Sequence, residues 1–507
     1  MNGLQRATLD SLTTAPYDIL IVGGGIYGAM AAREAGMRGY RTALVEQSDF
    51  GGGASHNSLK IVHGGIRYVQ HLDVMRLRAS VRERAFWRHV APELVKPLDF
   101  TIPLTGYGVK GPIVFRAAAM LYQALELGLR GPDFGSAGVV SDAVARQQLG
   151  QLAPKDLTGG GVWRDGQMLD TGRLQIAVLS AAARYGVHIA NYMAVDALAH
   201  SDGRVGGASV TDLTNGGTGK ISARVVLSCT GGSAKSLASK VIYPEAQDRF
   251  PAFARALNIV VDRQIGDRAM GIVGTEKSDA IVDRGGRMYF LTPWSGLTII
   301  GTHEAPACSH GTDTAVADFL DILNRAAPAL ELKSTDVLHT FDGMIPADVD
   351  DDRTGSVRRQ TAGTLLDHTS DGAAGLISVI GVKYTTARAI AARAMDVAAL
   401  QLGGVPASKE MQRQSLTEKL PNAAHLPVDL DDIEALTARM DHAMQHEMAM
   451  TLDDAVKRRM PLAESGAFSG SEGAKRYAQL KNIALEIGLS PEQFPHRKAL
   501  KKRLNLT

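Results

Sequence analysis

A short glycine turn between two apolar strands places the strongest constraint on the fold of this chain. Residues 17–22 (YDILIV) have the apolar, β-branched character of a strand that is buried on both faces, and residues 41–46 (RTALVE) repeat it. Between them, residues 23–28 (GGGIYG) match the pattern G-x-G-x-x-G and open a helix that we expect to end near Gly39. Connections this short predict a βαβ unit with parallel strands.

The glycine turn is typical of a site for the pyrophosphate of a dinucleotide. Its glycines allow a tight turn and a close approach of the backbone to the phosphates, and the following helix N-terminus presents free N–H groups. An acidic side chain about 20 residues further on accepts a hydrogen bond from ribose in such units. A purely structural turn in an α/β protein is the alternative. The residues predicted to bind the cofactor here are Gly23, Gly25, Gly28 and Glu46.

The later sequence alternates between two patterns and predicts a second sheet. A helix at 171–187 and a strand at 223–229 continue the α/β pattern, and a strand at 375–380 with an Ala-rich helix at 385–400 returns to it. Residues 287–301 instead have the pattern of an antiparallel hairpin. We therefore predict an α/β fold with a Rossmann-like cofactor-binding domain, an inserted antiparallel-sheet substrate domain and a helical C-terminal domain.

The changes of pattern also predict the segment boundaries. A leader at 1–16, expected to be frayed, precedes a two-domain region at 17–400. A helical domain follows at 405–507, with an internal loop at 464–473. We expect cofactor-binding segments at about 17–100, 160–235 and 340–400, and substrate-domain segments at about 100–160 and 236–340.

The composition excludes several classes of protein. A formal net charge of +2 over 507 residues argues against a nucleic-acid-binding protein. Cys229 and Cys308 are too few for a disulfide scaffold and lack metal-site spacing, which favours a reducing, cytoplasmic compartment. No run reaches the roughly 18 consecutive apolar residues of a membrane-spanning helix. The most apolar helical stretch, 112–129, either packs on the core or lies on a membrane surface.

A second glycine-rich segment narrows the choice of dinucleotide, since the first unit suits FAD and NAD equally. Residues 51–68 (GGGASHNSLKIVHGGIRY) resemble the Ser-Ser-(Lys/Arg)-Leu-Ile-His-Gly-Gly-Leu-Arg-Tyr segment of FAD-dependent glycerol-3-phosphate dehydrogenases, within the D-amino-acid-oxidase-like flavoprotein superfamily. The resemblance covers about residues 16–507. It recurs in the family's order in LDTGRL (169–174), SCTGG (228–232), LTPWSGLTIIGT (291–302), GVKYTTARAIA (381–391) and EMAMTLDDAVKRR (447–459).

The resemblance implies that FAD is the cofactor, and it assigns roles to the 58–68 segment. Because a flavin ring lies flat against backbone, the paired glycines would let the chain pass close to it, and the residues before them would address the flavin phosphate or ribitol. Arg67 would hold an anionic substrate oxygen and Tyr68 would line the substrate pocket. An ordinary salt bridge and a core aromatic are the alternative for this pair. The residues assigned to FAD are Ser58, Lys60, His63, Gly64 and Gly65.

A second flavin contact is expected at residues 381–386 (GVKYTT), where a strand ends and a helix begins. Reduced flavin gathers negative charge around N1, and a helix N-terminus backed by a lysine stabilises such charge. The two threonines also suit helix capping, which is compatible with flavin contact. By resemblance, the flavin contacts are Lys383, Thr385 and Thr386, further cofactor contacts are Thr230 and Gly231, and Arg388 reaches substrate or a structural partner.

Two positions depart from the family's pattern, and both concern the substrate. The family's Ser-Gly-Val-Arg-Pro-like run, whose arginine binds the substrate phosphate, corresponds here to FDGMIP (341–346), with Met344 or Ile345 in place of the cation. The family's Lys-Gly-Ser-His run, whose histidine is a candidate base, corresponds to RALN (255–258), and Asn258 cannot serve as that base. Losing one charge-assisted contact costs about 1.5–3 kcal/mol of binding free energy. Whether the substrate carries a phosphate group is therefore left open by the sequence.

His303 is our prediction for the missing base. It lies in GTHEA (301–305), where the family has Thr-Asp, and an imidazole titrates near neutral pH. The alternative is a surface histidine at a strand end. The predicted catalytic residues are Arg67, His303 and Lys383, and the predicted substrate-binding residues are Arg67, Tyr68, Asn258, Met344 and Arg388.

These motifs predict an FAD-dependent dehydrogenase that oxidises a secondary alcohol to a ketone, with the hydroxyl proton passing to a base and hydride to the flavin. An FAD enzyme acting on another polyol, a sugar derivative or an amine is one alternative, and a non-catalytic flavin-binding subunit is another. The resemblance implies a membrane quinone as electron acceptor, and dioxygen stays open. The basic tail HRKALKKR (496–503) is either solvated or contacts anionic lipid on the inner face of the membrane. In the second case each cation would contribute about 1 kcal/mol to the free energy of membrane binding.

Overall fold

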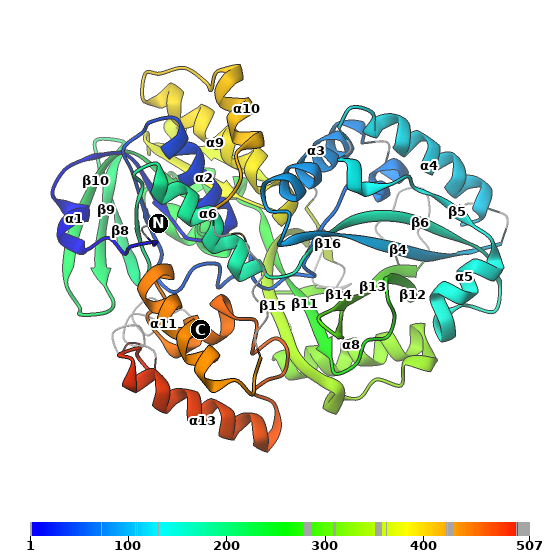
Figure 1. The fold of residues 1–507 in the computed structure, drawn as a ribbon. Helices are drawn as coiled ribbons and strands as arrows, with labels where there is room; N and C mark the ends of the chain where they lie inside the picture. Colours follow the sequence, from blue (N-terminus) through cyan, green and yellow to red (C-terminus); the bar gives the residue numbers. More distant parts are fainter. Residues whose placement is uncertain are drawn as a thin grey trace.

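The strands of the described residues form two β-sheets, and the C-terminal helices lie below the first sheet (Figure 1). The structure is a computed structural model. It describes residues 3–71, 73–106, 108, 110–129, 131–277, 286–307, 311–349, 357–360, 362–421, 423, 429–492 and 494.

The helices of the described residues can be grouped by the surface that they cover. The first sheet is covered by α2 (Ile26–Met37), α6 (Thr171–Arg184) and α9 (Ala387–Gln401). The second sheet is covered by α8 (Thr312–Ala326) on one face and flanked by α3 (Val74–Val90), α4 (Pro112–Glu126) and α5 (Asp142–Leu149). The C-terminal region holds α11 (Ile433–Glu447), α12 (Leu452–Asp454) and α13 (Gly470–Glu486), and the remaining helices are α1 (Leu9–Thr13), α7 (Ala234–Ala238) and α10 (Lys409–Thr417).

The first sheet contains the predicted βαβ unit. Its strands are β1 (Tyr17–Val22), β2 (Thr42–Val45), β7 (His188–Ala190), β8 (Met193–Ser201), β9 (Arg204–Asp212), β10 (Thr218–Ser228), β17 (Thr364–Asp367) and β18 (Leu376–Ile380). They run in the order β17-β18-β10-β1-β2-β7, with β8 and β9 continuing from β10. β1 pairs in parallel with both β2 and β10, so the parallel strands are confirmed. Their apolar runs are buried because helices cover one face and the β8–β9–β10 ribbon packs on the other.

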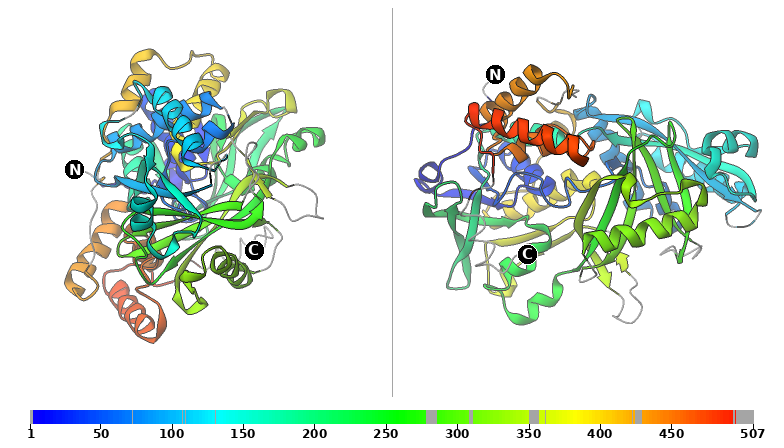
Figure 2. Two further views of the ribbon diagram at one scale, coloured as in Figure 1. Left: turned by 90° about the vertical axis from the view of Figure 1, so that its right-hand side faces the viewer. Right: turned by 90° about the horizontal axis from the view of Figure 1, so that it is seen from below.

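The second sheet is mostly antiparallel. Its strands are β3 (Ile61–Val62), β4 (Val95–Thr105), β5 (Gly138–Val140), β6 (Leu157–Met168), β11 (Ala252–Val261), β12 (Ala269–Lys277), β13 (Gly286–Trp294), β14 (Leu297–Pro306), β15 (Val337–Val349) and β16 (Val357–Arg359). The predicted hairpin is present as β13 and β14, which close at the pair Trp294–Leu297. β15 pairs with β11 and β16, so the strand at 337–349 belongs to this sheet. Figure 2 shows α8 lying along the outer face.

The N-terminal segment is packed, so the expectation of a frayed leader is wrong for its described part. The Leu4 side chain is buried, and its backbone N–H donates to the carbonyl of His446 in α11 at 2.8 Å. Arg6 forms an ion pair with Asp212 at 2.9 Å. No helix in the described part of the chain is long and apolar enough to cross a membrane.

Candidate active site

A cavity of about 1860 Å³ opens between the two sheets. Its walls come from the carboxyl ends of β1 and β2, from the turn after β18 and from one face of the second sheet. Ligands of open α/β sheets bind at the carboxyl ends of the strands. The topology therefore places the glycine turn of residues 23–28 and the segment 381–386 on one ligand site.

The glycine turn leaves no room for side chains. Gly23 has φ +106°, and a Cβ there would lie 2.6 Å from the carbonyl oxygen of Cys229. A Cβ on Gly28 would lie 1.9 Å from the carbonyl oxygen of Gly23, so the first turn of α2 can sit this close to the strand end only with glycine. Gly23 and Gly25 line the cavity, and α2 begins at the next residue. The helix N-terminus therefore opens onto the cavity, as an anionic pyrophosphate requires.

Glu46 stands at the rim of the cavity with its carboxylate fixed by the backbone. One carboxylate oxygen accepts from the N–H of Gly24 at 2.7 Å, and the other accepts from the N–H of Ser48 at 2.9 Å. The second oxygen also accepts from the Ser48 hydroxyl at 2.9 Å, so the oxygen that faces the Gly24 N–H is the one with a lone pair left for a ribose hydroxyl. The arrangement suits the role that the sequence predicts for Glu46.

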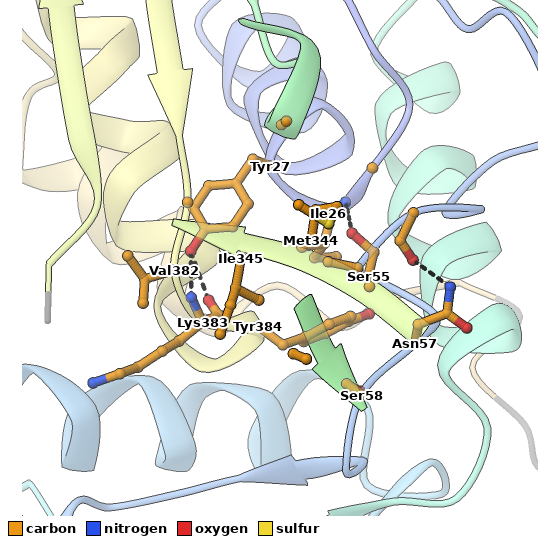
Figure 3. Close-up of a pocket in the computed structure, with 18 of the residues that line it drawn as sticks. Ile26, Tyr27, Ser55, Asn57, Ser58, Met344, Ile345, Val382, Lys383 and Tyr384 are labelled. Carbon is orange, nitrogen blue, oxygen red and sulfur yellow. Dashed lines mark hydrogen bonds between the residues drawn. The ribbon is translucent and has the colours of Figure 1, made fainter. Parts of the chain in front are cut away.

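Tyr27 joins the two cofactor segments directly, as Figure 3 shows. Its hydroxyl donates to the carbonyl oxygen of Lys383 at 2.6 Å and accepts from the N–H of the same residue at 3.1 Å. A Cβ on Gly381 would lie 1.8 Å from the Tyr27 ring, so glycine is needed where the ring crosses the backbone. Sequence reasoning missed Tyr27, although it occupies an x position of the G-x-G-x-x-G motif.

The turn after β18 is also tied to the segment before the paired glycines. Thr385 lines the cavity, and its hydroxyl accepts from the N–H of His63 at 3.2 Å. The indole N–H of Trp87 donates to the carbonyl of Thr385 at 3.0 Å. Thr386 does not line the cavity and directs its hydroxyl to the carbonyl of Lys383 at 3.5 Å. Of the two threonines, Thr385 is therefore the one placed for cofactor contact.

Tyr68 lies in the cavity wall next to two cations. The ammonium of Lys383 donates to its hydroxyl and lies 4.2 Å from its ring centroid, and the guanidinium of Arg76 lies 4.3 Å from the same centroid. Gly65 has φ +83°, and a Cβ there would lie 2.4 Å from the Tyr68 ring. The side chain of Arg67 lies outside the described residues.

The second sheet contributes a polar group of its own to the cavity. Asn258 is buried, and its amide oxygen accepts from the hydroxyl of Thr302 at 2.8 Å, which fixes the orientation of the amide. Arg287 and Glu304 also line the cavity and form an ion pair at 2.5 Å. Sequence reasoning missed this pair. Side chains alternate along a strand, so Thr302 and Glu304 point to the same face, and this pattern could have indicated Glu304 as a site residue.

The prediction that His303 is the base is contradicted by the geometry. Side chains alternate along β14, and its neighbours Thr302 and Glu304 both line the cavity. The His303 ring instead stacks on Phe319 of α8, with centroids 5.1 Å apart. His303 therefore lies on the face of the sheet that α8 covers. Leu257 and Tyr289 of the neighbouring strands pack on that same face.

Lys60 and Arg388 lie in buried ion pairs outside the cavity lining, which differs from the cofactor contact expected for Lys60 and agrees with the structural alternative for Arg388. The Lys60 ammonium pairs with Glu464 of the C-terminal region at 2.8 Å. Arg388 binds Glu83 through two contacts, with its Nε donating at 3.0 Å. Burying a cation without a partner is costly, and each arginine or lysine here has found a carboxylate within the protein. Neither side chain lines the cavity.

Gly64 also differs from its expected role. A Cβ at this position would lie 2.2 Å from the Tyr122 hydroxyl and 2.5 Å from Nη1 of Arg84. The glycine therefore makes room for two side chains of the protein. The other residues predicted to bind the cofactor that line the cavity are Ser58, His63, Gly65, Thr230 and Gly231.

Met344 lies in the cavity lining on β15, with 39% of its surface exposed. It is paired across the sheet with Arg255. The guanidinium of Arg255 is directed to Asp342, with its Nε donating at 2.9 Å, so this cation does not replace the family's arginine. Neither Met344 nor Arg255 therefore supplies the cation that the family has at this place.

Comparison with known proteins gives consistent matches. Residues 18–393 match the family model described as FAD dependent oxidoreductase. A glycerol-3-phosphate dehydrogenase of Synechocystis sp. is 31% identical over 451 residues, which cover 85% of this chain and 78% of that protein. The mitochondrial glycerol-3-phosphate dehydrogenase of Mus musculus is 32% identical over 78% of this chain, and this chain spans about half of its length, 54%.

Solved structures show the same fold. The glycerol-3-phosphate dehydrogenase from Bacillus halodurans complexed with FAD superposes with a TM-score of 0.68 at 20% identity, covering 98% of this chain and 96% of that one. An L-proline dehydrogenase from P. horikoshii superposes with a TM-score of 0.56 at 16% identity, covering 80% of this chain and 99% of that one.

Proposed function

Because the chain belongs to the FAD-dependent oxidoreductase family, we propose that it is a dehydrogenase that oxidises glycerol 3-phosphate, or a closely related phosphorylated secondary alcohol, to the ketone. Relatives named glycerol-3-phosphate dehydrogenase match over most of the chain. The observation that carries the proposal is the meeting of residues 23–28 with residues 381–386 in one cavity, through Tyr27.

FAD is the cofactor, and the residues of the cavity fit it. The N-terminus of α2 and the side chain of Glu46 suit the pyrophosphate and the ribose at one end. Gly65, Lys383 and Thr385 line the other end, where the flavin ring would lie. Bound FAD supplies the hydride acceptor for the reaction.

Within this proposal Tyr68 takes the role that His303 cannot fill and accepts the hydroxyl proton of the substrate. The support is geometric, since the ammonium of Lys383 donates to the Tyr68 oxygen and stabilises the phenolate that such a base requires. Arg76, over the same ring, adds a second positive charge. Asn258 offers an oriented amide that can donate to a substrate oxygen but cannot take its proton. We still predict that Arg67 binds an anionic oxygen of the substrate.

A second candidate function is oxidation of another polyol, a sugar derivative or an amine, and Met344 favours it. Met344 or Ile345 stands where the family's phosphate-binding arginine is expected, both residues line the cavity, and Arg255 is engaged by Asp342. The two functions differ in whether the substrate carries a phosphate group. Substitutions at 344 and 345 therefore separate them.

The test is anaerobic reduction of the bound FAD by a panel of glycerol 3-phosphate, free glycerol, sugar phosphates and amines. Bleaching of the flavin band by glycerol 3-phosphate supports the proposal, and bleaching only by an unphosphorylated compound supports the second candidate. No bleaching by any compound would favour a flavin-binding subunit without catalysis. An arginine at one of these two positions, Met344→Arg or Ile345→Arg, should lower the half-saturating concentration of a phosphorylated substrate about tenfold or more, because it adds a charge-assisted contact. Met344→Leu and Ile345→Leu are the matched controls.

The electron acceptor and the location remain predictions. Reoxidation of the reduced enzyme by a soluble quinone analogue, compared with reoxidation by air, decides between a quinone and dioxygen. The cytoplasmic location rests on cysteine usage, and Cys308 lies outside the described residues. The basic tail at 496–503 also lies outside them.

A further inference from the structure

Few cations line the cavity, and most of them already have a partner or lie toward the cofactor. The arginines and lysines of the described residues in the lining are Arg76, Lys240, Arg287 and Lys383. Arg287 is held by Glu304, and the ammonium of Lys383 donates to the hydroxyl of Tyr68. Lys240 follows α7, beyond the carboxyl end of β10 in the first sheet, where the proposed function places the cofactor. Arg76 is therefore the cation whose role needs an explanation.

Arg76 is held in the cavity wall by its Nε side and by an aromatic ring. Asp73 caps α3, and one of its carboxylate oxygens accepts from the backbone N–H of Arg76 at 3.0 Å. The other oxygen lies 3.2 Å from the Arg76 Nε as an ion pair without a hydrogen bond. The guanidinium lies 4.3 Å from the centroid of the Tyr68 ring, which is a cation–π distance. These contacts fix the guanidinium before any ligand binds.

The far edge of this guanidinium is left for a ligand. Arginine carries most of its N–H donors on its two Nη atoms, and together these atoms form a planar edge that can bind two oxygens of a phosphate at once. Within the described part of the chain, neither Nη atom of Arg76 makes a hydrogen bond. The side chain is 16% exposed, so these donors are only partly open to water. An anion in the cavity would therefore meet donors that the protein has not used.

Arg76 also lies beside the group that takes the substrate proton in the proposed function. The cationic groups of Arg76 and Lys383 lie 4.3 and 4.2 Å from the centroid of the Tyr68 ring. In glycerol 3-phosphate, the phosphate group is carried by the carbon next to the one that is oxidised. A substrate whose hydroxyl meets the Tyr68 oxygen therefore has its phosphate within reach of a guanidinium over the same ring.

The strand that supplies a cation in the family offers none here. Met344 and Ile345 of β15 line the cavity without a charge, and the guanidinium of Arg255 is engaged by Asp342. A phosphate that leaves water for the cavity needs an opposite charge, because burying an unpaired ion is costly. The start of α3 provides that charge from another direction.

We propose that Arg76 determines the specificity for a phosphorylated substrate, and that α3 thereby supplies the cation that β15 lacks. The Nη edge of Arg76 binds two oxygens of the substrate phosphate. The carboxylate of Asp73 stays on the Nε side, where the helix N-terminus that it caps offsets its charge. This inference rests on the proposed function, because it takes a phosphorylated secondary alcohol as the substrate.

The test measures anaerobic flavin bleaching by glycerol 3-phosphate, using the full chain with FAD bound. Arg76→Gln removes the charge and should raise the half-saturating concentration by about tenfold to hundredfold, the factor that a charge-assisted contact contributes. Arg76→Lys keeps the charge without the planar edge and should restore part of the loss. Arg82→Gln is the matched control and should behave like the wild type, since Arg82 is exposed on the same helix outside the cavity lining.

Inorganic phosphate gives a second readout that does not depend on turnover. Titration calorimetry of the oxidised enzyme with phosphate should show weaker binding by Arg76→Gln than by the wild type and by Arg82→Gln. The flavin spectrum of each variant reports whether it folds and holds FAD. A difference in phosphate affinity between variants with the same flavin spectrum supports a direct contact.

Three outcomes would overturn the inference. If glycerol 3-phosphate bleaches the wild type and Arg76→Gln at the same half-saturating concentration, the role of Arg76 is wrong and the proposed function stands. If Arg76→Gln lowers only the limiting rate and leaves the phosphate affinity unchanged, Arg76 acts through Tyr68 and does not bind phosphate. If the wild type is bleached by an unphosphorylated compound and not by glycerol 3-phosphate, the proposed function itself fails, and this inference fails with it.

Discussion

At the scale of single residues, the chemistry of the cavity depends on which side chains face it. Tyr68 and Lys383 come from segments more than 300 residues apart, and their polar atoms are in contact within the cavity. A phenol held against an ammonium can take and return a proton, which the amide of Asn258 cannot do. The proposed function therefore makes a definite prediction about the Tyr68 hydroxyl.

Tyr68→Phe should slow anaerobic reduction of the bound FAD by about 10²–10⁴-fold at saturating substrate, the usual contribution of a general base. The substitution keeps the ring that packs beside Gly65 and removes only the hydroxyl. Stopped-flow absorbance of the flavin band measures the rate, and the pH dependence of that rate should be lost together with the hydroxyl. Glu304→Gln provides the comparison, since Glu304 lines the same cavity in an ion pair with Arg287. A Tyr68→Phe rate within threefold of the wild type would remove Tyr68 from the mechanism.

At the scale of elements, buried ion pairs dock the C-terminal helices onto the cofactor domain. Asp49, in the loop after β2, pairs with Arg459 at 2.7 Å, and Glu447 at the end of α11 pairs with Arg173 of α6. Lys60 reaches Glu464 from the segment that precedes the paired glycines. The motif at 447–459 is thus explained by docking, and Lys60 belongs to the same contact. These pairs hold the loop that carries Ser58 against the cavity.

The contact between the C-terminal helices and the cofactor domain should weaken at acid pH. Burial alone would raise the pKa of Glu464, but Lys60 and His56 hold it at about 2, below the usual 4.5. A carboxyl whose pKa is lower in the folded state stabilises the fold above the unfolded pKa. Its contribution of about 3 kcal/mol is therefore present above about pH 4.5 and is lost as the pH falls toward 2. Hydrogen exchange in α11 and α13 should rise over that range before exchange in α2.

Glu464→Gln should lower the free energy of unfolding at pH 7 by about 3–5 kcal/mol, because it leaves the buried Lys60 ammonium without its counter-charge. Urea unfolding followed by circular dichroism measures the change. Glu472→Gln is the control, since Glu472 is an exposed residue of α13. Equal midpoints for the two variants would show that the Glu464 pair does not hold the domains together.

At the scale of the whole molecule, the cavity forms where two segments far apart in the sequence are hydrogen-bonded to each other. The Tyr27 hydroxyl of α2 hydrogen-bonds with both the N–H and the carbonyl oxygen of Lys383, and its ring occupies the space left by Gly381. Both sheets line the cavity, and in the proposed function the first holds the pyrophosphate and the second faces the substrate. Affinity for FAD should therefore depend on this link as well as on residues that contact the cofactor.

Tyr27→Phe should weaken FAD binding by about tenfold, because it removes two hydrogen bonds and leaves backbone groups of residue 383 unpaired, at about 1–3 kcal/mol. Fluorescence of released flavin during dilution measures the dissociation constant. Tyr40→Phe is a matched control, because Tyr40 packs on the same hydrophobic core away from the cavity. An unchanged affinity of Tyr27→Phe for FAD would show that residues 23–28 and 381–386 are positioned without the Tyr27 hydrogen bonds.

The sequence by itself determined the βαβ unit, the hairpin of β13 and β14 and the residues of the glycine turn, because these follow from local periodicity and from glycine positions that only one backbone geometry satisfies. Only the tertiary structure decided which face of β14 carries His303, which carboxylates hold Lys60 and Arg388, and that one apolar face of α4 stays outside the core. The reason is physical. A side chain's direction on a strand or helix follows from local geometry, but what lies in that direction is set by strand register and by elements far away in the sequence.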